Sequence, residues 1–424
     1  MSPIRIVVAG GNYAGLNAVR HLYATLLAPT KSTAAPDASQ PNVEITLIDK
    51  RDGFLHYIGI TRGFTEPEYG DRLWVPYASV PWLQHPCVSV CHDTIAKITS
   101  SSVDLASGTQ VPFDYLVIAL GETRAAPVGT EATTKEQFIR ELDKVHRQIK
   151  GSRTVAVVGG GAVGIEMAAD IKCDFANKNV ILAHSRALPL PGPFTDEFRE
   201  QVVDILRNDI GVNVILGQRV INQAPNCEIP APDDGYLLTL ADGRQLTADC
   251  VIRCLGANNS IKHLIDLPTQ QDAELPLFGP RGIRVRDTMQ VDCVEYPNIY
   301  ACGDICARDD VKLAGVAMYG AYIAARNIAR TILTQRSTGG CAELEEAFRY
   351  PSKIMLLMGK AHFAMQCGDE IWEKDRIRPF ILDDMGLQLS IDGLSLSQNP
   401  DYDDLLIKSD QVLSPGNRKP IKLQ

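Results

Sequence analysis

The sequence lacks any long apolar run. Its longest stretch without a charged residue extends from Leu73 to His92, and this stretch is interrupted by Pro76, Pro81 and Pro86. Proline breaks helices, and a bilayer-spanning helix needs about 20 predominantly apolar residues. The sequence therefore predicts no transmembrane segment. The first predicted strand begins at Ile4, so we also expect no signal or transit peptide.

The sequence also has no excess of basic residues. Its 51 Asp and Glu residues outnumber 42 Lys and Arg residues, which leaves a net charge of −9. This balance argues against nucleic acid as a partner. The acidic, irregular tail around Asp401-Tyr-Asp-Asp404 does not support peripheral membrane contact through an amphipathic helix.

Paired cysteines are absent as well. The 11 cysteines are odd in number and scattered, so we interpret them as thiols of a reducing, cytoplasmic compartment. Cys87-x3-Cys91-His92 lacks the four ligands of a structural zinc site, and we predict no metal.

What the sequence does contain is the average composition of a large soluble protein. It has 424 residues, of which 45% are apolar and 22% are charged, and this size predicts two or three domains.

Two strand–glycine–helix segments dominate the pattern. The first is a β-branched run from Ile4, the turn Gly10-Gly-Asn-Tyr-Ala-Gly15, a helical stretch and a second strand, 43–48, that ends in Asp49. The middle glycine of the dinucleotide fingerprint is replaced by Asn12, which tolerates the positive φ that such a turn needs.

The second segment carries the intact fingerprint Gly159-x-Gly161-x-x-Gly164 between strands at 153–158 and 180–183. In both segments, backbone N–H groups at a helix N-terminus would reach a pyrophosphate. The second strand is followed by His184-Ser-Arg186, without a carboxylate to bind a ribose 2′-hydroxyl. We therefore predict NADPH, with Arg186 at the 2′-phosphate and NADH as a possible donor; the alternative is a solvated Arg186.

Each half closes with a buried strand that ends on glycine, at Gly121 and at Gly256. A third such strand ends in Ala301-Cys-Gly-Asp304 and precedes an apolar helical stretch at 313–332. Tyr236 to Leu246 predicts a hairpin with its turn at Asp242-Gly243.

Taken together, these segments resemble the two-dinucleotide-binding-domain flavoproteins. The similarity is greatest to the apoptosis-inducing-factor-like oxidoreductases (ferroptosis-suppressor and AMID type), which are related to type II NADH:quinone oxidoreductases. The resembling phrases include Asp49-Lys-Arg-Asp-Gly-Phe-Leu-His56, Trp74-Val-Pro-Tyr77 and Gly161-Ala-Val-Gly-Ile-Glu166, and they span about 4–330.

The resemblance implies an α/β fold with two Rossmann-like doubly wound domains, one for FAD and one for NAD(P)H, and a small C-terminal α+β region. The implied boundaries are 1–125 with 285–342 for FAD, 126–284 for NAD(P)H, and 343–424 for the C-terminal region. The implied FAD contacts are Gly10, Gly11, Asn12, Tyr13, Ala14, Gly15, Asp49, Lys50, Arg51, Gly121, Gly303 and Asp304. Those for NAD(P)H are Gly159, Gly161, Gly164, Arg186 and Gly256.

Three residues are candidates for catalysis. Glu166 matches a family glutamate near the nicotinamide; the alternative is an acid that merely suits a helix N-terminus. His56 lies in the segment that resembles the loop under the isoalloxazine, where it would shape the site or donate a proton; a packed loop residue is the alternative. Lys312 would neutralise reduced flavin or lie in solvent.

Relatives that reduce disulfides carry Cys-x-x-Cys or Cys-x4-Cys beside the flavin, and this sequence has neither. We therefore expect an enzyme that passes electrons from NAD(P)H through FAD to a quinone or another small-molecule acceptor. A soluble flavin oxidase or dehydrogenase of a biosynthetic metabolite and a non-catalytic FAD/NAD(P)H-binding redox sensor remain alternatives.

Overall fold

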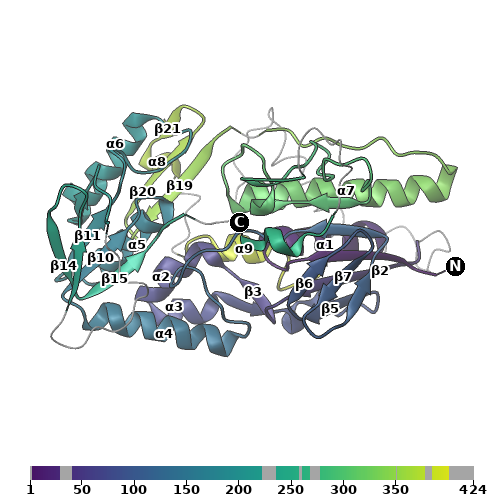
Figure 1. Ribbon diagram of the computed structural model, residues 1–424, viewed down its shortest axis with the longest axis horizontal. Coiled ribbons are helices and arrows are strands. Elements are labelled where there is room, and N and C mark those ends of the chain that lie inside the picture. The colour runs from purple at the N-terminus through teal and green to yellow at the C-terminus, as the bar shows by residue number, and fades with distance from the viewer. Residues whose placement is uncertain are drawn as a thin grey trace.

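The computed structural model describes residues 2–28, 41–221, 235–256, 260–267, 277–349, 351–377 and 384–400. Within these ranges, two parallel sheets lie in opposite halves of the molecule (Figure 1). The acidic tail from Asp401, and most of the surface insertion expected between Ala28 and Asn42, lie outside the described residues. No helix in the described ranges is long and apolar enough to cross a membrane.

The first sheet has the strand order β18-β9-β1-β2-β5, and all its pairings are parallel. Its central strand is apolar on both faces because both faces are covered: Ile6, Val7 and Val8 are at most 1% exposed. Helices α1 and α7 pack against each other, and the small antiparallel sheet β6-β7-β8 adds side chains to the same core. The elements of this half are β1 (Ile4–Ala9), α1 (Tyr13–Leu26), β2 (Val43–Asp49), β5 (Val88–His92), β6 (Ile95–Ile98), β7 (Ser102–Leu105), β8 (Gln110–Pro112), β9 (Tyr115–Ile118), β16 (Phe278–Gly279), β17 (Gly282–Ile283), β18 (Ile299–Ala301) and α7 (Ala314–Thr338).

The second sheet has the order β12-β11-β10-β15, again all parallel. The hairpin β13–β14 packs on one side of it and closes a small core of its own, with the predicted turn at Gly243, whose φ is +87°. The elements of this half are β10 (Thr154–Val158), α5 (Ala162–Asp174), β11 (Asn179–Ala183), α6 (Asp196–Asp204), β12 (Asn213–Ile215), β13 (Tyr236–Thr239), β14 (Gln245–Ala248) and β15 (Cys250–Arg253).

Short elements connect the halves along one side of the molecule (Figure 1). They are β3 (Gly53–Leu55), α2 (Ile60–Thr65), α3 (Pro67–Arg72), β4 (Trp74–Pro76) and α4 (Lys135–Gly151). Helix α2 contacts α5 of the second half.

The C-terminal region is built on the second half. Its antiparallel sheet β19-β20-β21 places β19 (Lys353–Met358) on α5 and β20 (His362–Cys367) on α6. The sequence pattern of 371–397 is consistent with strands and turns, and this interpretation is wrong in part. After β21 (Glu370–Trp372), the described residues form α8 (Lys374–Ile377) and α9 (Leu387–Gly393).

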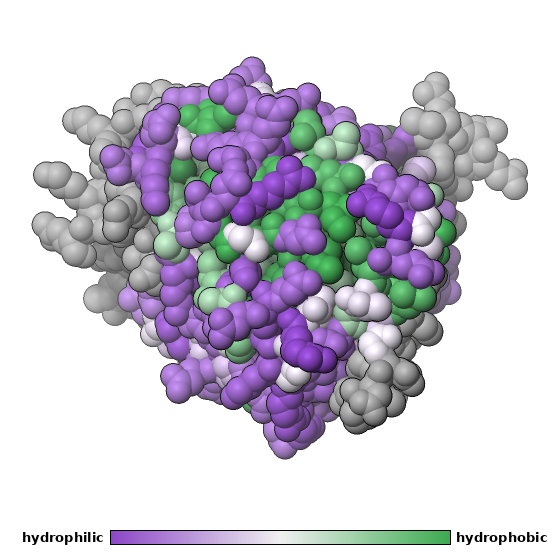
Figure 2. Space-filling view, turned by 90° about the vertical axis from the view of Figure 1, so that its left-hand side faces the viewer, coloured by the Kyte–Doolittle hydropathy of each residue, from purple (hydrophilic) through white to green (hydrophobic). Residues whose placement is uncertain are grey.

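Figure 2 shows the end of the molecule that carries the second sheet. A recessed apolar area lies at its centre, and hydrophilic side chains surround it. Contiguous apolar surface of this kind is unusual on a fully solvated face, so this end of the molecule is not uniformly polar.

Candidate active site

The first glycine turn connects β1 to α1 in a conformation that requires glycine. Gly10 has φ +100°, and a Cβ on Gly15 would lie 1.7 Å from the Gly10 carbonyl oxygen. The turn forms with Asn12 in place of the middle glycine, and Asn12 does so in extended backbone, with φ −95°. Asn12 makes no side-chain cap, so the first N–H groups of α1 remain available to an anion.

Asp49 holds this turn from the end of β2. Its carboxylate accepts hydrogen bonds from the Gly11 N–H and, at 2.7 Å, from the Arg51 N–H. The Tyr77 hydroxyl donates to the Gly11 carbonyl at 2.7 Å on the other side. The predicted ribose ligand is therefore also the residue that fixes the turn, although each carboxylate oxygen keeps a free lone pair.

The two basic residues after Asp49 have different surroundings. The Lys50 ammonium pairs with exposed Glu131 at 3.2 Å. The Arg51 guanidinium donates to the Tyr57 hydroxyl at 2.7 Å and lies 5.4 Å from the centre of that ring, while its Nε is buried without a partner. An orphaned cationic donor beside the turn suits a phosphate ligand.

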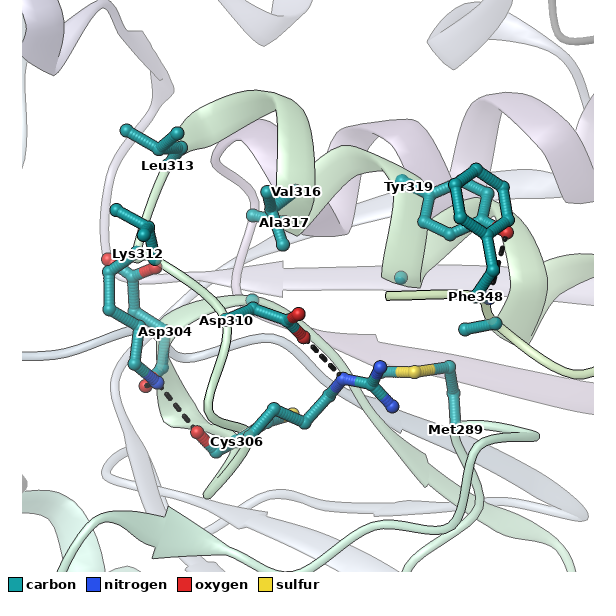
Figure 3. Close-up of a pocket in the computed structure, with 15 residues that line it drawn as sticks. Met289, Asp304, Cys306, Asp310, Lys312, Leu313, Val316, Ala317, Tyr319 and Phe348 are labelled. Carbon is teal, nitrogen blue, oxygen red and sulfur yellow. Dashed lines mark hydrogen bonds and ion pairs between the residues drawn. The ribbon is translucent and has the colours of Figure 1, made fainter. Parts of the chain in front are cut away.

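Asp304 follows β18 after Gly303, whose φ is +79°. Burial raises the pKa of the Asp304 carboxyl, and the positive charges of Lys312 and Arg124 oppose this rise. The Lys312 ammonium donates to the carbonyls of Asp304 at 2.7 Å and Cys306 at 2.6 Å (Figure 3). Lys312 therefore ties the ends of this loop together instead of extending into solvent.

A pocket that is open to solvent adjoins this loop. Asp304, Lys312 and Leu313 line one end, and Tyr319 and Phe348 line the other (Figure 3). Helix α7 begins beside it at Ala314, without a side-chain cap or an acidic residue in its first turn. Its N-terminus therefore offers unpaired N–H groups, and the loop offers a buried carboxylate.

His56 is completely buried and uses both ring nitrogens. Its Nε2 lies 3.0 Å from the Met385 carbonyl oxygen, and its Nδ1 lies 3.0 Å from the Tyr13 hydroxyl. Because a carbonyl only accepts, Nε2 carries the proton and the Tyr13 hydroxyl donates to Nδ1. Burial lowers the pKa of His56 to about 4, so the ring is neutral at physiological pH and has no free proton to donate.

The second glycine turn repeats the first. Gly159 has φ +119°, and a Cβ on Gly164 would lie 1.8 Å from the Gly159 carbonyl oxygen. Gly161, the N-cap of α5, has open space around its Cα. Gly256 follows β15 with similarly open space, and Gly121 follows β9 with φ +68°.

His184 occupies the place in the second unit that Asp49 has in the first. Asp49 directly follows Ile48, which pairs with the last residue of β1, and His184 directly follows Ala183, which pairs with the last residue of β10. His184 Nδ1 accepts the Gly160 N–H at 3.0 Å, as Asp49 accepts the Gly11 N–H. Burial and the nearby charge of Arg186 lower the pKa of His184, which keeps the imidazole neutral. Arg186 itself is exposed.

Glu166 lies on the first turns of α5 and faces the C-terminal hairpin. Its Oε1 accepts the Leu357 N–H at 3.1 Å, and burial raises the pKa of its carboxyl to about 8. One turn later, buried Asp170 has its pKa raised to about 6 by burial. Asp170 accepts from the Thr61 hydroxyl at 3.0 Å and pairs with Arg62 at 3.4 Å.

The sequence analysis missed Asp170 and Arg62. Both are buried, and their pairing connects α5 to α2, which lies 108 positions away in the chain. The only signal in the sequence was a charged residue, Asp170, inside an apolar helical pattern, and this signal does not identify Arg62 as its partner. Tyr77 was quoted only as part of a phrase, and its bond to Gly11 was not anticipated.

The cysteines nearest Asp304 are unreactive by placement. Burial raises the pKa of Cys306 to about 12 and that of Cys302 well above its ordinary value. A thiol needs access and a depressed pKa to exchange disulfides. No cysteine in the described ranges forms a disulfide.

The residues present fit FAD. An anionic diphosphate matches the uncapped N-terminus of α1, the orphaned Nε of Arg51 and the glycine cradle at Gly10 and Gly15. A polar ring edge matches the uncapped N-terminus of α7. A second cradle of the same form begins α5. Two such cradles, one at the carboxyl end of each parallel sheet, define a protein of the two-dinucleotide oxidoreductase class.

Comparison with known proteins agrees. The family model described as pyridine nucleotide-disulphide oxidoreductase matches residues 4–321, and the chain belongs to this family. It is an FAD-dependent NAD(P)H oxidoreductase.

Curated relatives include oxidoreductase OXR1 of Ajellomyces capsulatus, 29% identical over 94% of this chain and 89% of the relative. Ferroptosis suppressor protein 1 of Homo sapiens is 27% identical over 78% of this chain and 81% of the relative. Apoptosis-inducing factor homolog B of Dictyostelium discoideum is 25% identical over 76% of this chain and 80% of the relative.

Solved structures share the fold. A NAD-dependent persulfide reductase from A. fulgidus aligns with a TM-score of 0.62 at 20% identity, over 89% of this chain and 65% of that one. A ferredoxin reductase from Rhodopseudomonas palustris aligns with a TM-score of 0.60 at 17% identity, over 86% of this chain and 88% of that one. This chain therefore spans slightly less than two thirds of the first structure and most of the second.

Proposed function

We propose that this enzyme takes electrons from NADPH and passes them through FAD to a quinone or another small-molecule acceptor, without a redox-active disulfide. The observation that carries the proposal is the inaccessibility of Cys302 and Cys306 beside the Asp304 loop. Electrons therefore leave to an acceptor that brings its own redox group. The sequence resemblance to type II NADH:quinone oxidoreductases favours a quinone.

The proposed FAD site uses residues of 1–125 and 285–342. When bound, FAD supplies the chemistry of accepting a hydride and releasing electrons. The turn at Gly10 to Gly15 would bind the diphosphate, and Asp304 would bind the ribitol chain. We propose a positioning role for Lys312, because it fixes the Asp304 loop and contributes a positive charge that favours the ionised carboxylate.

The proposed NAD(P)H site lies in 126–284 on the turn from Gly159 to Gly164. Glu166 would orient the nicotinamide. Its raised pKa of about 8 makes it predominantly a neutral acid at pH 7, able to donate a hydrogen bond to a carboxamide oxygen. His56 has no proton to give, and we propose that it acts by position, as developed below.

Two residues support NADPH over NADH. His184 stands where the first unit has Asp49, so no carboxylate at this position opposes a 2′-phosphate. Exposed Arg186 lies close enough to lower the pKa of His184 and would pair with the phosphate. Arg186→Ala is expected to lower the NADPH/NADH ratio of kcat/KM by about ten-fold or more, from the loss of a charge-assisted hydrogen bond. An unchanged ratio contradicts the assignment. Arg153→Ala, an exposed change at the opposite, amino end of β10, is the control for loss of an arginine.

The proposed function is tested by a visible spectrum of the purified protein and anaerobic addition of NADPH. We expect flavin absorption that bleaches within seconds and returns when a quinone is added. A flavin that stays oxidised with NADPH would favour the oxidase or sensor alternatives. A protein that neither contains nor takes up FAD would contradict the proposal.

The free cysteines support the proposed cytoplasmic location, because disulfides are rare in reducing compartments. Fractionation of cells that express a tagged full chain tests it. Recovery of the protein in a membrane or lumenal fraction would contradict it.

A further inference from the structure

The C-terminal strap, defined here as residues 384–396, crosses from one half of the molecule to the other beyond the end of the family match at residue 321. Its first part buries Met385 and Leu387 in the core that contains the second sheet, and each is 1% exposed. Its last part buries Leu394 and Leu396 in the core of the first sheet. Figure 1 shows α9, the helix of the strap, where the two halves meet.

Ring hydrogen bonds hold both ends of the strap. At the first end, His56 Nε2 donates to the Met385 carbonyl at 3.0 Å, beside a bond of 2.7 Å from the Tyr69 hydroxyl to the Asp384 carbonyl. At the other end, Trp82 Nε1 donates to the Ser395 carbonyl at 2.9 Å.

The two held residues are also the strained ones. Met385 and Ser395 both have φ +53°, the left-handed region that non-glycine residues rarely adopt. In this conformation the carbonyl of each accepts from a fully buried ring donor, His56 or Trp82. Strain of this kind persists only where surrounding contacts over-determine it.

A directed chain of hydrogen bonds connects the strap to the start of α1. The Met385 carbonyl accepts from His56 Nε2, and His56 Nδ1 accepts from the Tyr13 hydroxyl. Tyr13 is the first residue of α1, directly after Asn12 in the glycine turn. At the far end of the strap, Arg20, farther along the same helix, lies 3.3 Å from the Ser395 hydroxyl.

We propose that the strap retains FAD by holding the N-terminal turn of α1 in its diphosphate-binding conformation, with His56 as the positioning residue that transmits this hold. The inference rests on the FAD site described above. It assigns a role to the C-terminal region and to His56, whose single N–H is already used by the Met385 carbonyl.

The test uses four full-length variants. Trp82→Phe keeps a buried aromatic ring but removes the N–H that holds Ser395, together with one ring of the fully buried indole; this site lies far from Tyr13 along the strap. His56→Leu removes both bonds of the chain, whereas His56→Gln keeps one donor and one acceptor and serves as the conservative rescue. Trp372→Phe, which loses an indole bond to Glu370 on exposed β21, is the matched control.

The readouts are FAD dissociation, followed by the fluorescence of released flavin, and hydrogen exchange of 384–396. We expect Trp82→Phe to raise the FAD Kd about five-fold, the equivalent of one lost neutral hydrogen bond, and His56→Leu to raise it at least ten-fold. His56→Gln should recover most of the affinity, and added FAD should slow exchange in the wild-type strap. If His56→Leu does not fold, Trp82→Phe still tests the proposal.

Faster strap exchange in Trp82→Phe with an unchanged FAD Kd would overturn the proposal. So would an equal loss of FAD in Trp372→Phe. Reduction of the bound wild-type flavin by NADPH, measured separately, reports on the proposed function, so failure of one is distinguishable from failure of the other.

Discussion

Replacing Glu166 by glutamine should make the protein more stable, and more so as the pH rises. The glutamine Oε1 still accepts the Leu357 N–H, so packing and hydrogen bonding are kept and only ionisation is removed. In the folded protein, burial raises the pKa of Glu166 to about 8, against an ordinary value of 4.5. The folded state therefore holds a proton that the unfolded state releases.

The sign follows from this difference in bound protons. The contribution of the protonated Glu166 is fully present below pH 4.5 and is lost as the pH rises through 8. The wild-type free energy of unfolding falls by about 1.4 kcal/mol per pH unit from this group within that window. The stability difference between E166Q and wild type should therefore grow by about 3 kcal/mol between pH 5 and pH 7.5. Asp170 titrates in both proteins, and its contribution largely cancels in the difference.

The assay is urea unfolding at pH 5, 6, 7 and 7.5 with a fixed, saturating FAD concentration. Glu200→Gln, an exposed change on α6, is the control and should give a constant difference from wild type. Parallel pH profiles for E166Q and wild type would refute the reasoning, since they would mean that Glu166 ionises as easily in the folded as in the unfolded chain.

Two further outcomes follow from the same contacts. Gly164→Ala should destabilise the fold by several kcal/mol, because its Cβ would lie 1.8 Å from the Gly159 carbonyl oxygen. Gly161→Ala should leave the Tm unchanged and weaken NADPH binding, because the space around Gly161 is open to the proposed ligand. Equal Tm losses for the two variants, measured by calorimetry, would contradict the contact geometry. Cys306→Ala should retain the proposed NADPH-dependent quinone reduction to within about two-fold, since its thiol is buried with a pKa of about 12. Loss of turnover in a variant that still holds FAD would restore a thiol mechanism.

Local sequence predicted the two glycine turns and the strands around them. The strand predicted at 180–183 lies within β11, Asn179–Ala183, and the helix predicted at 313–332 lies almost wholly within the longer α7, Ala314–Thr338. These features depend on near neighbours: a glycine is needed where φ is positive, and an apolar run marks a strand covered on both faces.

The C-terminal region was predicted less well, because its structure depends on residues far away in the chain. Its strap has no strong local pattern, because its conformation is imposed by His56 and Trp82 from distant parts of the chain. A left-handed φ at Met385 or Ser395 contradicts local preference, and burial and tertiary hydrogen bonds help to stabilise it.

The sequence by itself determined the fold class, the two dinucleotide cradles and the absence of a cysteine pair at the expected position, since each is a matter of residue type and short spacing. The tertiary structure decided what the polar side chains do. It placed Lys312 on backbone carbonyls, made His56 a neutral link between α1 and the strap, and buried Glu166 against the hairpin. A side chain's protonation state and role depend on burial and on partners tens to hundreds of positions away, and local sequence does not encode these surroundings.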